Sequence, residues 1–149
     1  LHIKDIAVIG MMSAILIATF LVIGFLPNIE LVSLLIILYT LVFGWKAIFI
    51  IYTFVLVDGI IYGFGLNWVL YLYVWLILFL IARLFKNLRS PFYWGIISGL
   101  FGLFFGAFDS LIYVVIGGVN TGIAHWVAGI GYDVLHCIGN FITALLQTN

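Results

Sequence analysis

Long apolar stretches, separated by short polar or glycine-rich breaks, run along the chain from its first residues to its last. A helix rises about 1.5 Å per residue, so roughly 20 apolar residues cross a bilayer core of about 30 Å. The pattern predicts an all-α integral membrane protein, with one transmembrane domain over residues 1–149 and six transmembrane helices. We expect these helices near residues 6–25, 30–43, 46–63, 68–84, 92–115 and 122–146.

Two of these stretches need interpretation. The first is longer than the apolar part of a signal peptide, so we expect a permanent span. The stretch from 30 to 63 is too long for one helix, and Gly44-Trp45-Lys46 in its middle indicates a tight turn. We therefore expect a helical hairpin there, and a pair of half-spanning re-entrant helices is the alternative.

Composition and charge support a membrane protein and predict its orientation. The chain is 67% hydrophobic and 7% charged, whereas a soluble domain carries about 25% charged residues. When the six stretches are threaded back and forth, the basic residues all fall on one side: Lys4, Lys46, Arg83, Lys86 and Arg89. Short basic loops stay cytoplasmic. Both termini are therefore expected inside, with short uncharged loops at 26–29, 64–67 and 116–121 outside.

Small residues at helical spacing predict close contacts between helices. The fifth stretch carries a glycine series that continues into Asp109 and Tyr113 and so points this acid into the bundle; its members are Gly95, Gly99, Gly102 and Gly106. The first stretch carries Gly10, Ala14 and Ala18. This second set indicates either a contact within the chain or a docking face for another membrane subunit.

Four acids lie at the outer side or within the spans: Glu30, Asp58, Asp109 and Asp133. An ionised side chain at membrane depth costs a few kcal/mol or more, and no lysine or arginine lies in the outer half to pair with them. Each acid is either a protonated or hydrogen-bonded structural carboxyl or part of a ligand site. We expect a shared, outward-opening pocket for a cationic or amino-bearing ligand.

Aromatic, amide and imidazole side chains at the same level complete this expected pocket. For the tryptophans an interfacial aromatic belt is the alternative, and for the histidines a structural hydrogen bond. The expected substrate-binding residues are Asp58, Asn67, Trp68, Asp109, Tyr113, Asn120, His125, Trp126, Tyr132, Asp133 and His136.

Other chemistry finds no support in the sequence. His125 and His136 are about 16 Å apart along a helix, too far to hold one metal ion, so neither a metal nor another cofactor is expected. The chain has no nucleophile–base triad and no phosphate-binding loop. It also lacks an extended basic surface for nucleic acid. The chain is therefore not expected to be an enzyme.

Three segments carry a resemblance to a known family: IAVIGMMSAILIA in the first helix, the following FLPNIELVSLLI, and the late WVAGIGYDVLHCIGNF. With six spans in a chain of this length, they resemble the substrate-binding S component of energy-coupling factor (ECF) vitamin transporters. The resemblance implies a multi-pass protein of a bacterial plasma membrane that captures a vitamin from outside. Pro27, Asn28 and Glu30 in the first outer loop would then form a lid.

The resemblance also implies partners. The face formed by Gly10, Ala14 and Ala18 would dock on a membrane T component that carries two cytoplasmic ATPase subunits, which hydrolyse the ATP. The S component topples in the membrane to deliver its substrate. Carboxyls and imidazoles without an outer basic residue favour hydroxymethylpyrimidine, pyridoxine or thiamin over anionic vitamins, and cobalamin stays open. The alternatives are a proton- or cation-coupled transporter or channel that uses the intramembrane acids, and a purely structural membrane subunit.

Overall fold

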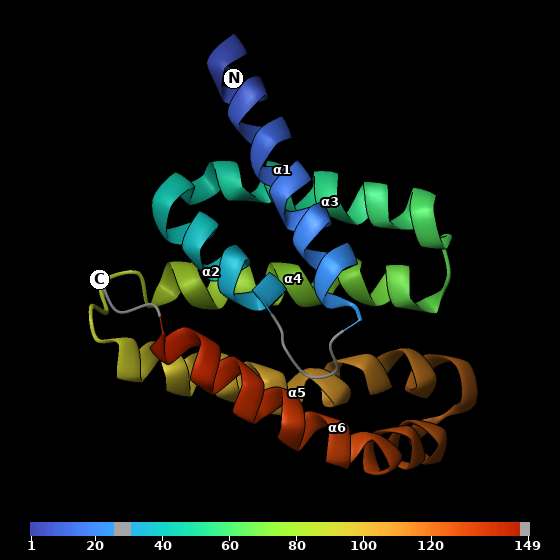
Figure 1. The fold of residues 1–149 in the computed structure, drawn as a ribbon. Coiled ribbons are helices and arrows are strands. Elements are labelled where there is room, and N and C mark those ends of the chain that lie inside the picture. The colour runs from blue at the N-terminus through green and yellow to red at the C-terminus, as the bar shows by residue number, and fades with distance from the viewer. Residues whose placement is uncertain (26–30, 147–149) are drawn as a thin grey trace. The chain divides into compact units, whose positions relative to one another are not determined.

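A computed structural model of the chain describes residues 1–25 and 31–146, and within these ranges it is all-α, as predicted. The elements form two compact units, one with α1–α4 and one with α5 and α6. The single transmembrane domain stays a prediction. In chain order (Figure 1), the elements are α1 (Ile3–Ile23), α2 (Leu31–Phe43), the 3-10 turn η1 (Gly44–Lys46), α3 (Ala47–Tyr62), α4 (Leu66–Leu84), α5 (Pro91–Gly117) and α6 (Val119–Leu145).

The helices have the length and composition of membrane spans. Four helical segments of the described chain are long and apolar enough to cross a bilayer: Ile3–Ile23, Leu31–Tyr62, Leu66–Leu84 and Pro91–Gly117. Many large apolar side chains on these segments face outward, such as Ile6, Leu56 and Leu80, where lipid would cover them. The structure is thus that of an all-α chain compatible with a membrane. Six spans and their orientation stay predictions.

The long apolar segment Leu31–Tyr62 is folded back on itself at η1 (Figure 1), so the turn expected at Gly44-Trp45-Lys46 is confirmed. The choice between a spanning hairpin and a re-entrant pair stays a prediction. Gly44 has φ +58°, in the left-handed region that favours glycine. Both α2 and α3 pack against α4. The two helices have 13 and 16 residues, which correspond to about 20 and 24 Å, less than the bilayer core.

Charged groups gather at one end of the α1–α4 unit. The ammonium of Lys46 lies 2.6 Å from the carboxylate of Asp5, near the start of α1. The guanidinium of Arg83 lies over the ring of Trp45, 5.2 Å from its centroid. These contacts bring the N-terminus, the η1 turn and the end of α4 to the same end of the unit, as the threading of the apolar stretches predicted.

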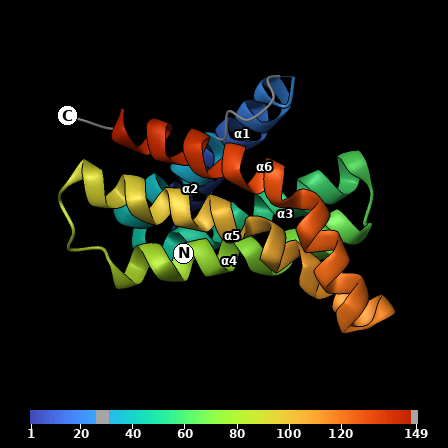
Figure 2. The ribbon, with the colours of Figure 1, turned by 90° about the horizontal axis from the view of Figure 1, so that it is seen from below.

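The second unit is an antiparallel pair of helices joined by one residue (Figures 1 and 2). Its contact follows the predicted glycine series: a Cβ added at Gly102 would lie 2.8 Å from the backbone oxygen of His136, and one at Gly99 would lie 3.3 Å from that of Cys137. Only a hydrogen atom fits at Gly102 without displacing backbone. The close contact predicted for this series is confirmed.

Two of the loops predicted to lie outside are shorter than expected. The loop predicted at 116–121 is wrong, because α5 continues to Gly117 and α6 begins at Val119, with Gly118 alone between them. The loop predicted at 64–67 ends early, because α4 starts at Leu66. In both places a glycine with positive φ, Gly118 at +89° or Gly63 at +96°, redirects the chain within very few residues.

Because these loops are shorter, two candidate site residues lie in helices. Asn67 and Asn120, expected in loops, lie in the first turns of α4 and α6. α5 begins at Pro91, one residue before the span expected from 92, and the side chain of Ser90 makes no capping hydrogen bond.

Candidate ligand-binding site

A cavity of about 480 Å³ lies between α5 and α6, and five of the predicted site residues line it. Its volume falls within the range of about 300–1,000 Å³ typical of small-molecule pockets. The lining comprises Phe105, Gly106, Asp109, His125, Ala128, Gly129, Tyr132, Asp133 and His136. Asp109 of α5, Asp133 of α6 and the two imidazoles of α6 therefore meet around one space.

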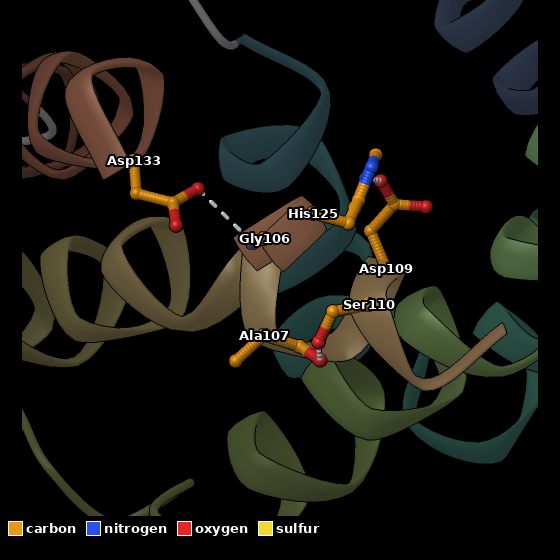
Figure 3. A network of polar contacts seen from close by, with 6 residues as sticks. All are labelled: Gly106, Ala107, Asp109, Ser110, His125 and Asp133. Atoms are coloured by element: carbon orange, nitrogen blue, oxygen red, sulfur yellow. Dashed lines mark hydrogen bonds and ion pairs between the residues drawn. The ribbon is translucent and has the colours of Figure 1, made fainter. Parts of the chain in front are cut away.

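Asp109, His125 and Tyr113 form an ordered group at this cavity. His125 Nε2 lies 2.7 Å from Asp109 Oδ2 (Figure 3), and the imidazole stacks on the Tyr113 ring at 3.7 Å between centroids and 17° between planes. Asp109 and Tyr113 are one turn apart on α5 and hold the imidazole from α6 between them. The side chains of His125 and Asp109 are 36% and 25% exposed, so the pair is fixed in place yet reachable.

Asp133 is the most buried acid of the cavity, at 5% exposure. Its Oδ1 accepts a hydrogen bond from the Gly106 backbone N–H at 3.0 Å (Figure 3). Its Oδ2 is buried and accepts no hydrogen bond from the described residues. The indole of Trp126 lies near this carboxyl but at no ordinary hydrogen-bond geometry. One carboxyl oxygen is thus held by the fold, and the other is buried without a hydrogen bond from the described residues.

Glycine at position 106 makes this arrangement possible. A Cβ added there would lie 2.5 Å from Asp133 Oδ1, closer than packed atoms approach. The missing side chain leaves room for the carboxyl against the α5 backbone. In contrast, the Ser110 hydroxyl, also near this part of α5 (Figure 3), donates to the Ala107 carbonyl at 2.7 Å, so its hydrogen bond stays within α5.

The remaining predicted residues of α5 and α6 lie beside this cavity rather than in its lining. Tyr113 reaches it only through its stack on His125. Trp126 is 37% exposed. Asn120 is exposed in the first turn of α6. Three residues that line the cavity were not predicted from the sequence: Phe105, Ala128 and Gly129. Each lies three or four positions from a predicted site residue on the same helix, so helical spacing could have identified them.

Asp58, Asn67 and Trp68 meet in the α1–α4 unit. Asp58 and Asn67 line two cavities of about 200 and 290 Å³, and Trp68 lines the smaller one. The Trp68 indole N–H donates to the Val55 carbonyl at 3.1 Å, so this ring is fixed by the fold. The predicted binding residues therefore fall into two groups, one in each unit. A single pocket shared by all the acids stays a prediction.

The predicted docking face on α1 is open. Gly10, Ala14 and Ala18 are exposed, and a Cβ added at Gly10 would have no described atom within 4 Å. The role of these residues in docking stays a prediction. The predicted lid residues Pro27, Asn28 and Glu30 lie outside the described residues.

Comparisons of the chain with family models, with curated proteins and with solved structures find no match.

Proposed function

We propose that this chain is the substrate-binding subunit of an ATP-driven importer of the ECF type. It would capture a small vitamin or vitamin precursor outside a bacterial cell and deliver it inward with a T component and two ATPases. The observation that carries the proposal is the cavity of about 480 Å³ between α5 and α6, lined by acids, imidazoles and rings. The sequence resemblance supplies the family.

The chemistry of the cavity supports the choice of substrate. Its acceptors are the Asp109 carboxyl, oriented by His125, and the unpartnered Oδ2 of Asp133. The rings of Phe105 and Tyr132 supply apolar walls, and no lysine or arginine lines it. A flat ring with amino or hydroxymethyl donors would satisfy both carboxyls and stack on aromatic faces. Hydroxymethylpyrimidine and pyridoxine have this chemistry.

The exposed small residues of α1 support the proposed partner. Because Gly10, Ala14 and Ala18 leave the helix backbone uncovered, a helix of the T component could approach closely there. The sequence contains no phosphate-binding loop. ATP hydrolysis would thus belong to the partner ATPases.

The proposed inside location of both termini makes a labelling prediction. In a Cys137→Ser background, cysteine at Gly65 is expected to react with a membrane-impermeant maleimide in intact cells. Cysteine at Asn87 should react only after permeabilisation. Both sites are exposed, Gly65 before α4 and Asn87 after it. Labelling is read by gel shift, and the reverse pattern would contradict the proposed orientation.

Ligand binding by the isolated chain tests the function itself. The chain, purified alone in detergent, is expected to bind one vitamin at nanomolar strength, seen by native mass spectrometry and by a raised Tm. A ligand at 1,000 times its Kd stabilises the folded state by about 4 kcal/mol. Hydroxymethylpyrimidine, pyridoxine, thiamin and cobalamin form the first panel, with biotin as an anionic control. If nothing binds while the reconstituted chain alone conducts protons, the proposal is wrong.

A further inference from the structure

Asp58 is a buried acid without a partner. It lies in the last turns of α3 and is 6% exposed. No hydrogen bond or ion pair joins its carboxyl to any described residue. It nevertheless faces space, because it lines both cavities of the α1–α4 unit. Burying an unpaired carboxylate in an apolar protein costs free energy. A cation bound beside Asp58 would offset this cost.

Residues with oxygen-bearing side chains line the two cavities together with Asp58. Asn67 and Tyr62 line both cavities, and Tyr71 also lines the larger one. The smaller cavity includes Gly63, where α3 ends. The last carbonyls of a helix have no partner within it, and they carry the negative end of its dipole. No lysine, arginine or histidine lines either cavity.

We propose that Asp58, Asn67 and the carboxyl end of α3 bind one alkali-metal cation, for which Na⁺ is the probe. One carboxylate neutralises one positive charge, whereas Ca²⁺ takes 6–8 oxygen ligands, typically with several carboxylates. Cavities of about 200 and 290 Å³ are below the size typical of pockets for organic ligands. A small monovalent ion fits the charge, the donor type and the space.

The cation site and the proposed vitamin site use different residues. Its residues belong to the α1–α4 unit, and the Asp109–His125 pair and Asp133 belong to the other. Vitamin binding can therefore fail while Na⁺ binding holds, and the reverse.

Sodium-dependent stability tests this proposal. The full chain in detergent, at neutral pH and constant ionic strength, is melted in increasing NaCl balanced by choline chloride. We expect Tm to rise by at least about 2 °C and to saturate. Asp58→Asn should abolish the rise, because it removes the charge and keeps the shape. Asp5→Asn, which removes an acid outside both cavities, should keep it.

Several outcomes would overturn the cation site. Equal Tm values in sodium and choline would do so, as would an undiminished sodium response in the Asp58→Asn variant. If the Asp58→Asn variant does not fold, ²²Na⁺ binding to the wild-type chain is measured directly by scintillation proximity. We expect this binding to saturate at one ion per chain. Absence of saturable ²²Na⁺ binding would overturn the cation site.

Discussion

The Gly102→Ala variant is expected to lose about 2 kcal/mol or more of its free energy of unfolding. The added methyl group would lie 2.8 Å from the His136 backbone oxygen and 3.0 Å from Asn140 Nδ2. Overpacking of this kind costs about 1–3 kcal/mol. Because the obstacle at 2.8 Å is backbone, relief requires α5 and α6 to separate. SDS titration in mixed micelles measures the free energy of unfolding.

Gly131→Ala is the matched control for this prediction. Gly131 lies in α6, and a Cβ added there has no atom within 4 Å. Alanine favours a helix over glycine by about 1 kcal/mol, so this variant is expected to be unchanged or more stable. The two substitutions are chemically identical and should act with opposite sign. Equal effects would show that the close contact along the glycine series does not hold the pair together.

Asp109→Asn is expected to weaken vitamin binding at least tenfold, which is about 1.4 kcal/mol. The amide still reaches His125 Nε2, which lies 2.7 Å from Asp109 Oδ2, but it offers a ligand donor no carboxylate oxygen. Isothermal titration of the purified variant with the vitamin found by the binding screen measures Kd.

Two controls distinguish a lost ligand contact from a damaged fold. Asp5→Asn, which changes an acid on α1 that is paired with Lys46, should leave Kd unchanged. The Tm of ligand-free Asp109→Asn shows how far the fold itself is affected. Unchanged affinity in this variant would make Asp109 a structural carboxyl that only orients His125.

The α5–α6 pair shows how far sequence reasoning reaches. Glycines at helical spacing predicted a close contact, and Asp109 on the same stripe was expected to point into the bundle; in the structure its carboxylate meets His125 of α6. Gly10, Ala14 and Ala18 are also small residues at helical spacing, yet all three are exposed in the described chain. Spacing shows that a helix can approach closely. It does not show which helix does so.

The limits of the sequence are clearest at the turns and at Asp133. One positive-φ glycine, Gly118, replaced a predicted loop, because hydropathy cannot distinguish a one-residue turn from a longer one between apolar segments. The unequal state of the two Asp133 oxygens depends on Gly106, 27 positions earlier in the chain. Such a contact depends on helix rotation, which periodicity fixes only coarsely.

The single-residue link at Gly118 also bears on how the chain enters a bilayer during synthesis. α6 is the least apolar of the six described α-helices and is not among the segments apolar enough to cross alone. Its acid and imidazoles lie against α5, and one residue separates the helices. The two would therefore leave the translocon as a preformed hairpin, in which the apolar α5 carries its polar neighbour into lipid.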